Sequence, residues 1–286
     1  MENFENKNII FDIEKSSNFE GNDSVLLYER LQHPGVKKQI LDLMSEFEQT
    51  KEPVRITSYD VDEVGNFIET SSSEEERKIK NREELEKELD ERVKAVFHST
   101  DIEHDEVVVG SFSKGKGDVG TIFLRGINPD DGKKYSIKQL SIIEAHEKGH
   151  GIRDFMGAGE IFKSKIRSGF DFSKLSIEEK MRKEFIEIEM QEAFNTTEKR
   201  EIDEDSVNKR ILDYFMQPNE IIERMSQLRN YFGMKGIEVF TREHLQYAKN
   251  NYTKDTGMGM QIQLFFDAIT PETEEKFLEL INTLGI

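Results

Sequence analysis

Residues 141–151 read SIIEAHEKGHG and place His146 and His150 four positions apart, with Glu147 directly after the first histidine. On an α-helix, positions i and i+4 lie on one face, so both imidazoles can reach a single Zn²⁺ at roughly 2.0–2.1 Å. The Glu147 carboxylate then lies beside the metal ion rather than on it. From there it can take a proton from a water molecule and pass it to a leaving amine. The spacing therefore predicts a Zn²⁺ site with Glu147 as general base and acid.

The residues before this stretch favour a metal-binding helix over a surface helix that carries two histidines by coincidence. Ser136 and Gln139 form a capping-box pattern, which predicts where the helix starts. An apolar face follows, formed by Ile137, Leu140, Ile143 and Ala145. Further upstream, residues 119–125 (VGTIFLR) are typical of a β-strand. Motif and context together indicate a metal site.

The composition limits both the ligands and the partners. Of 286 residues 34% are charged, and the net charge is −18, so the surface repels a nucleic-acid backbone and an anionic membrane alike. We therefore expect neither as a partner. The chain has no cysteine, so any zinc ligand must be His, Asp or Glu.

The sequence carries no targeting signal of a familiar kind. Its first residues, MENFENK, lack the basic and apolar regions of a signal peptide. No run approaches the roughly 18 apolar residues of a membrane-spanning helix. We expect a soluble, cytoplasmic protein, whose oligomeric state the sequence leaves open.

Hydrophobic periodicity divides the chain into four segments and predicts an α+β fold. Residues 1–23 are interpreted as a flexible arm and 24–156 as a lobe with a small mixed sheet and the His146 helix. Residues 157–210 are a charged helical insertion, and 211–286 form a helical lobe.

Within the sheet lobe, two short helices are expected on either side of Pro34. The run 71–76 (SSSEEE) predicts the start of a helix that continues to Phe97 and backs the sheet, and His104 is placed in the acidic loop after it. The expected strands cover 53–59, 106–112 and 119–125, the last two joined as a hairpin.

A catalytic Zn²⁺ takes three protein ligands, so a third must come from elsewhere in the chain. Glu220 follows Pro218, which suits the first turn of a helix, and from that position its carboxylate can point at the metal. Other acidic residues remain as alternatives: Glu187, Glu189 and Glu192 on an amphipathic segment, and Asp154 and Glu160 closer to the histidines.

The H-E-x-x-H stretch followed by Glu220 on a later helix resembles the gluzincin group of zinc metallopeptidases. The sequence from Ala145 to His150 is also similar to that of intracellular peptidases that cleave phage repressors. In that family the glutamate that serves as third ligand comes sooner in the chain, which would favour a residue within 178–192. The metzincin extension is excluded, because Arg153 and Met156 stand where that group needs glycine and histidine.

The gluzincin resemblance implies a zincin-like fold, with a sheet lobe and a helical lobe on either side of Zn²⁺, and hydrolysis of peptide bonds in a protein or peptide substrate. It also implies an oxyanion donor, for which His244 and Tyr214 are the leading candidates, beside Tyr247 and Tyr252. Arg224 replaces the acid that thermolysin-type peptidases have four residues after the ligand, so Glu223 or Asp154 would have to orient an imidazole.

Two further hypotheses remain from the sequence. An edge strand beside the metal helix would let a peptide substrate add itself as a further strand. The alternative to a peptidase is a binding or structural protein that keeps a zincin-like fold without proteolysis.

Overall fold

The computed structural model of the chain describes fourteen stretches of residues. They are 22–50, 54–61, 67–75, 79–98, 100–105, 110–114, 120–127, 132–153, 166–172, 175, 209, 211–214, 217–258 and 260–286. The expected N-terminal arm (except its last two residues) and nearly all of the expected insertion lie outside them.

The N-terminal half begins with two helices joined at a proline, as predicted. Helix α2 (Asp23–Gln32) is capped by Asn22, whose side chain accepts hydrogen bonds from the backbone of the first turn, and α3 (Pro34–Thr50) starts at the proline itself. The backbone nitrogen of Asp23 donates to the Ser141 hydroxyl at 2.7 Å. This contact fixes the start of α2 against the helix that carries the histidines.

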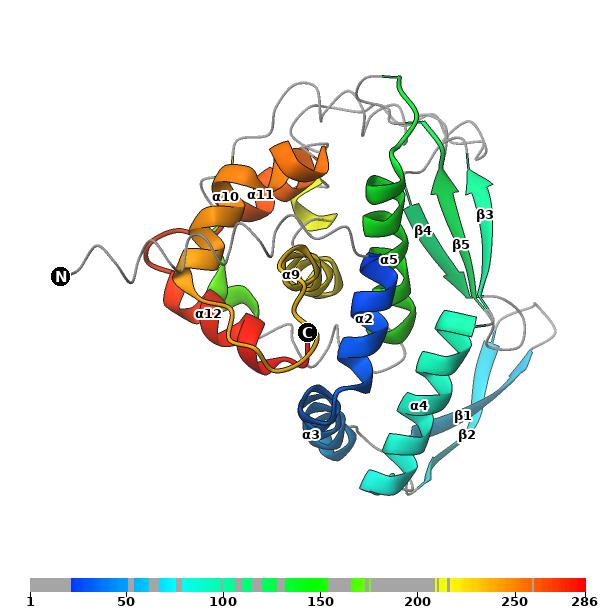
Figure 1. The fold of residues 1–286 in the computed structure, drawn as a ribbon. Helices are drawn as coiled ribbons and strands as arrows, with labels where there is room; N and C mark the ends of the chain where they lie inside the picture. The colour runs from blue at the N-terminus through cyan, green and yellow to red at the C-terminus, as the bar shows by residue number, and fades with distance from the viewer. Residues whose placement is uncertain are drawn as a thin grey trace.

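The strands form two separate small sheets. Strands β1 (Val54–Val61) and β2 (Phe67–Glu75) pair antiparallel as a hairpin. The second sheet has the order β3-β5-β4, in which β5 (Gly120–Arg125) pairs parallel with β3 (Asp101–Asp105) and antiparallel with β4 (Gly110–Lys114). A small mixed sheet combined with helices confirms the α+β class (Figure 1).

The predicted start of a helix at residues 71–76 is wrong, because residues 71–75 form the second half of β2, and Glu76 lies outside the described residues. Pairing with β1 overrides the local preference of the serine and glutamate run for a helix start. The real start lies at Asn81, whose side chain accepts from the Glu84 backbone while the Glu84 carboxylate accepts from the Asn81 backbone. This capping box opens α4 (Arg82–His98).

His104 was expected in a loop and lies instead in β3, at the edge of the mixed sheet. An edge strand pairs on one side only, so a polar sequence such as DIEHD can form one without a buried face. Of the strand predicted at 106–112, the part from Gly110 on lies in β4, and 106–109 are outside the described residues. The predicted hairpin of the last two strands is confirmed.

Helix α5 (Ile137–Arg153) carries the two histidines and packs between the mixed sheet and the other helices (Figure 1). Its predicted capping box is present: the Gln139 backbone donates to the Ser136 hydroxyl, and the Ser136 backbone donates to the Gln139 side chain. Ile143 packs against Ile122 and Leu124 of β5, so the sheet covers one face of the helix.

Helix α9 (Pro218–Tyr231) lies at the centre of the molecule, with α5 and α2 on one side and the C-terminal helices on the other (Figure 1). Those helices are α10 (Arg242–Thr256), α11 (Met260–Asp267) and α12 (Glu274–Thr283), within the segment predicted to be helical. Every α9 residue from Glu220 to Tyr231 is buried.

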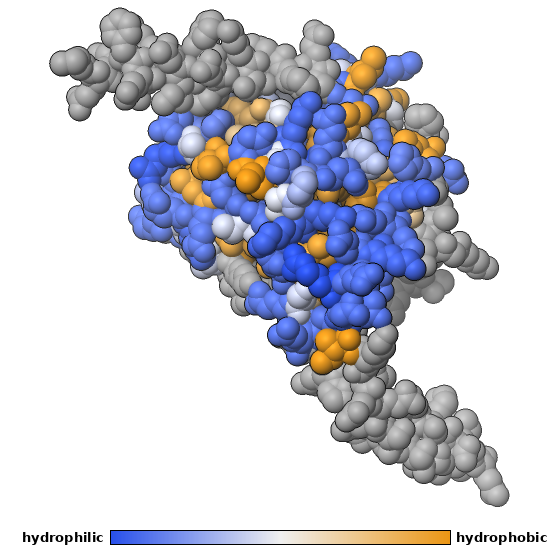
Figure 2. Space-filling model, turned by 60° about the horizontal axis from the view of Figure 1, so that its bottom comes forward, coloured by the Kyte–Doolittle hydropathy of each residue, from blue (hydrophilic) through white to orange (hydrophobic). Residues whose placement is uncertain are grey.

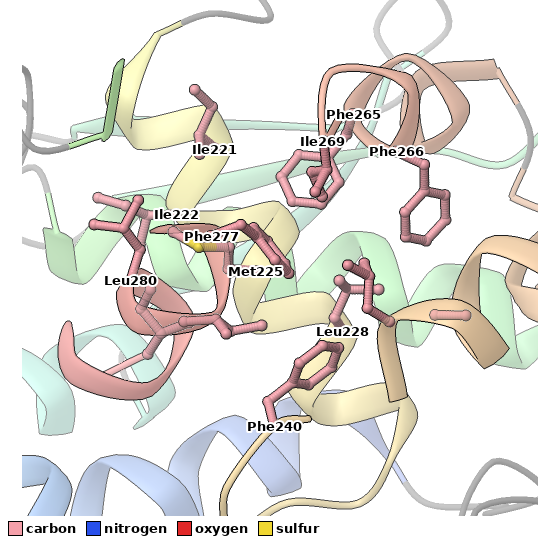
Figure 3. Packing of buried hydrophobic residues seen from close by; sticks show 14 of the residues in the cluster. Ile221, Ile222, Met225, Leu228, Phe240, Phe265, Phe266, Ile269, Phe277 and Leu280 are labelled. Atoms are coloured by element: carbon pink, nitrogen blue, oxygen red, sulfur yellow. The ribbon is translucent and has the colours of Figure 1, made fainter. Parts of the chain in front are cut away.

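One side of α9 forms the largest hydrophobic core. Figure 3 shows Ile221, Ile222, Met225 and Leu228 of α9 among aromatic and aliphatic side chains of the C-terminal lobe, which include Phe240, Phe265, Phe266, Ile269, Phe277 and Leu280. Between Glu220 and Asn230, the remaining positions of α9 are polar or charged although they are also buried. They need partners inside the protein, because an unpaired buried polar group is costly.

Buried arginines supply several of these partners. The Arg30 guanidinium of α2, only 1% exposed, donates to the side chains of Ser226 and Asn230 at 2.7 Å each. Arg229 of α9 itself donates to the carbonyl oxygens of Gly236 and Glu238. The polar positions of α9 thus attach it both to the N-terminal half and to the turn that follows it.

The surface matches the high charge of the sequence. On the face shown in Figure 2, hydrophilic residues dominate the coloured area, and hydrophobic ones lie in small, separate groups. Among the described helices, none combines the length and the apolar character needed to cross a membrane.

The packing of α9 predicts which truncations destabilise the fold. Leu228→Ala should lower the free energy of unfolding by about 2–5 kcal/mol, because Leu228 is 0% exposed and its removal leaves a cavity in the core. Ile137→Ala is the matched control: Ile137 is 88% exposed, and its truncation should change stability by no more than about 0.5 kcal/mol. Denaturant unfolding of both variants would measure this, and equal losses would contradict the central position of α9.

Candidate metal centre

The two histidines of α5 point their Nε2 atoms at each other. His146 and His150 lie one helical turn apart, their ring planes make an angle of 85°, and the distance between the two Nε2 atoms is 3.1 Å. At most one of these nitrogens can donate a hydrogen bond to the other, so two neutral rings with both Nε2 atoms bare would repel each other. A cation between the nitrogens would remove this repulsion.

Glu220 completes the cluster from α9. Its Oε1 lies 3.0 Å from His150 Nε2, and its Oε2 lies 3.2 Å from His146 Nε2. Pro218 occupies the first turn of α9, as predicted, and puts Glu220 at the helix start that faces α5. We call His146, His150 and Glu220 the metal cluster.

The metal cluster has the chemistry and the dimensions needed to hold a metal ion. Ligands about 2.1 Å from a tetrahedral ion lie about 3.4 Å from one another, close to the 3.0–3.2 Å separations found here. All its ligand atoms lie within 4.8 Å of one another, and within the described part of the chain no other group of three or more acidic or histidine side chains meets this condition. Two imidazoles and a carboxylate are a ligand set of catalytic zinc sites.

The electrostatics of the cluster demand a positive charge. Burial lowers the pKa of His146 to about 3, which leaves this ring neutral and able to bind a metal. For His150, burial is outweighed by the hydrogen bond and charge of Glu220 and by the other nearby carboxylates, which raise its pKa to about 9. Burial alone would raise the pKa of Glu220, but both histidines hold it well below its usual range. Without a metal ion, a proton on His150 supplies the charge.

Glu147 lies beside the cluster, as its position next to His146 predicts. It is 6% exposed, and burial together with the charges of Glu220 and Glu223 raises its pKa to about 7, against the opposing effect of His150 and Arg224. A carboxylate with a pKa near neutrality can accept a proton and return it within one reaction cycle.

Of the candidate oxyanion donors, Tyr214 is the one that reaches the cluster. Its ring is partly exposed, yet burial of its hydroxyl end and the negative charges of Glu220 and Glu147 raise its pKa, and the hydroxyl hydrogen-bonds the Glu220 carboxylate. The phenol therefore stays protonated and keeps an O–H to donate.

His244 is held elsewhere. Its Nδ1 accepts from the Thr241 backbone at 3.1 Å in the capping box of α10, and its ring packs on Phe232 and Phe240. In the described part of the structure, none of its hydrogen-bond or ring partners belongs to the metal cluster. Tyr247 likewise packs on Tyr231 and Phe232. The competing candidate Tyr252 is 1% exposed within the core of the C-terminal lobe.

The residues around the ligands differ from the sequence expectation. Glu223 was a candidate to orient an imidazole, but its carboxylate pairs with Arg153 at the end of α5. The His146 Nδ1 atom has no hydrogen-bond partner among the described residues. The other residue proposed for this role, Asp154, lies outside them.

Arg224 brings a positive charge to the same place. It is 6% exposed, and its Nη2 lies 3.8 Å from the Glu220 Oε2 atom, one helical turn away on α9. Its charge also acts on Glu147 and Tyr214, whose pKa values it lowers against the larger effect of burial. The residue that departs from the thermolysin-type pattern is therefore part of the site.

Among the alternative third ligands, Glu160, Glu187, Glu189 and Glu192 fall on residues that the structure does not describe, as does Asp154. Glu220 is the acidic residue that the described structure brings to both imidazoles. Comparison with models of protein families, with curated proteins and with solved structures finds no match for this chain.

Binding of Zn²⁺ should release protons, because both imidazoles must be neutral to act as ligands. The metal-free His150, with its pKa at about 9, carries a proton at about pH 7.5 and has lost most of it at about pH 10. Proton release per bound ion should therefore fall by most of one proton over this range. Calorimetry in buffers of different ionisation enthalpy measures the release. Glu147→Gln, which removes the other titrating group, is the control, and a release that does not change with pH would contradict the assignment.

Proposed function

We propose that this protein is a zinc-dependent metallopeptidase of the gluzincin type, which hydrolyses peptide bonds in a protein or peptide substrate. The observation that carries the proposal is the Glu220 carboxylate 3.0–3.2 Å from both imidazole Nε2 atoms, with Glu147 next to the first histidine. These are the ligands and the base that hydrolysis of an amide at neutral pH requires.

In this proposal His146, His150 and Glu220 hold the ion and leave a position open for water and substrate. A bound Zn²⁺ would supply Lewis acidity, polarising the scissile carbonyl and making a water molecule more acidic. Glu147 removes a proton from the attacking water and delivers it to the nitrogen of the leaving amine. A pKa near about 7 suits both steps, since the same group must accept and give up a proton.

Tyr214 and Arg224 are proposed to stabilise the negative charge that develops on the carbonyl oxygen. The support is electrostatic: both groups lie within range of Glu147 and Glu220, one as a neutral O–H donor and the other as a cation. Donors aimed at a developing oxyanion in a buried site contribute strongly to catalysis. His244 is not included, since its ring serves the start of α10.

The substrate is proposed to bind as an extended chain. Strand β4 is an edge of the described mixed sheet and packs beside α5, so its free side offers backbone groups to a peptide running along the metal helix. A sheet, a helix with the two histidines and a later helix with the glutamate correspond to a zincin-like arrangement. We propose that the protein acts in the cytoplasm, in line with its lack of cysteine.

The first test separates metal binding from catalysis. Glu147→Gln should retain one Zn²⁺ per chain but lose turnover by about 10²–10⁴-fold, because the general base is gone and the ligands remain. Elemental analysis of the purified protein and mass-spectrometric detection of cleavage in a proteome-derived peptide library would measure the two properties.

His146→Ala is the matched variant, and it should lose both the metal and the cleavage. Unchanged cleavage by Glu147→Gln would remove the proposed mechanism. Zn²⁺ binding without cleavage of any peptide by the wild-type protein would instead support the alternative of a binding protein with a zincin-like fold.

Tyr214→Phe should lower kcat by about 10–10³-fold with little change in Zn²⁺ content, since it removes one donor to the oxyanion and no ligand. Tyr247→Phe is the control, because Tyr247 packs on Tyr231 and Phe232. Steady-state kinetics on a peptide identified from the library would measure both variants. Equal rates for Tyr214→Phe and the wild type would exclude the phenol from the reaction.

A further inference from the structure

Helix α9 contacts α5 at Gly149, which lies between the two histidines in the sequence. A Cβ atom built on Gly149 would overlap the Oε2 and Cδ atoms of Glu223 and would lie 2.7 Å from an Arg153 nitrogen. No side chain fits there without displacing a buried carboxylate. The glycine of the H-E-x-G-H stretch is thus where the Glu223 carboxylate rests on α5.

Glu223 and Arg153 form an ion pair at this contact, which joins α9 to α5. Glu223 is 0% and Arg153 4% exposed. On α9, Glu220 and Glu223 are three residues apart and so lie on neighbouring turns of one face. On α5, Gly149 and Arg153 are four residues apart and likewise share one face. The ion pair therefore lies one turn along from the metal cluster, on the same helix–helix contact.

Neither half of this arrangement is explained by stability alone. A glycine within a helix is unfavourable compared with alanine, and a buried ion pair seldom stabilises a fold more than apolar residues of the same size would. Moreover, Glu223 Oε2 and Arg153 Nη2 have no hydrogen-bond partners among the described residues. The helical glycine and the buried ion pair occur together, next to the metal ligands. This placement suggests that they serve the arrangement of the two helices at the metal cluster.

We propose that Glu223 and Arg153, seated on Gly149, are positioning residues for the metal centre: they fix the separation and rotation of α9 relative to α5, so that Glu220 stands between the two imidazoles before an ion binds. They act on the third ligand through the helix that carries it, not through a hydrogen bond to a histidine. The inference rests on the proposed zinc site and adds how that site is assembled.

The test compares Zn²⁺ affinity with fold stability in the full chain. Glu223→Gln keeps the shape against Gly149 and removes the charge, so it should lower Zn²⁺ affinity by about 10–100-fold, as loss of a supporting partner does in other metal sites. Glu223→Asp keeps the charge but moves it away from Gly149, so its Zn²⁺ affinity should lie between those of Glu223→Gln and the wild-type protein. Affinity is measured by competition with a chelator, at a temperature where circular dichroism shows the metal-free variants to be folded.

Arg30→Met is the matched control. Arg30 is an equally buried arginine that holds the same helix from α2, and its hydrogen bonds to α9 go to Ser226 and Asn230 rather than to Glu223. It should lower the melting temperature while changing Zn²⁺ affinity by less than about threefold. Should Glu223→Gln not fold, Arg153→Lys takes its place, because it keeps a positive charge without the fixed guanidinium geometry.

A second readout reports geometry directly. The visible absorption of the Co²⁺-substituted protein depends on the number and arrangement of ligands, so Glu223→Gln should alter that spectrum and Arg30→Met should not. Gly149→Ala should lower Zn²⁺ affinity by about tenfold or more, and this effect should shrink in a Glu223→Ala background, where the carboxylate is gone.

The outcomes distinguish the inference from the proposed function. A wild-type protein that binds Zn²⁺, together with Glu223→Gln and Gly149→Ala variants that bind it equally well, would overturn the inference and leave the metal centre intact. Affinity losses of equal size in Arg30→Met and Glu223→Gln would also overturn it, because the pair would then be merely structural. A wild-type protein that binds no Zn²⁺ would overturn the proposed function and the inference together.

Discussion

The contact between α5 and α9 at Gly149 is the constraint on which the rest of the structure depends. Because the glycine has no side chain, a carboxylate of one helix reaches the backbone of the other and meets Arg153 there. The same approach brings Glu220 to both imidazoles. A wider separation would leave Glu223 without its partner and Glu220 out of reach of His146 and His150. Close packing and metal-binding geometry are therefore two results of one contact.

The position of α9 explains why a helix with so many polar residues can lie at the centre of the protein. One side of α9 contributes to the largest hydrophobic core. Its other sides carry charged and amide side chains, which are buried next to polar groups of other segments. Arg30 and Arg153 come from the N-terminal half, and Arg229 holds the turn after the helix. A buried polar group without such a partner would destabilise the fold. The three arginines are therefore buried where they pair with polar groups of α9 or of the turn that follows it.

Local signals in the sequence predict the helices of the site well, because capping boxes and a proline at the first turn act within a few residues. Ser136 with Gln139 marks the start of α5, and Pro218 marks the start of α9 with Glu220 in its first turn. Where local and long-range preferences compete, prediction fails: the run 71–76 has the caps and acids typical of a helix start, but its residues 71–75 pair with β1 instead. The local signal of the real helix start is the capping box of Asn81 and Glu84.

The arrangement around the ligands could not be predicted from the sequence, since it depends on a pairing across 70 residues that no periodicity encodes. A glycine inside the metal helix and a second glutamate three residues after Glu220 were the available signals, and neither specifies its partner. His244 was predicted as an oxyanion donor, but it serves in the cap of a helix instead. Its ring is held by Thr241 and by two phenylalanines. The type of side chain alone therefore does not distinguish a residue of the metal site from one that caps a helix.

The distance along the chain between the two halves of the centre also bears on how the protein is made. A nascent chain that has left the ribosome only as far as α5 has two histidines and an unmatched Arg153, but no third ligand. The centre can form only after α9 has been synthesised and has packed against α2 and α5, and its contact with α2 joins residues as far apart as Arg30 and Asn230, 200 positions along the chain. Assembly of the site is thereby tied to synthesis of the chain through α9, and a chain that stops before this helix lacks the third ligand.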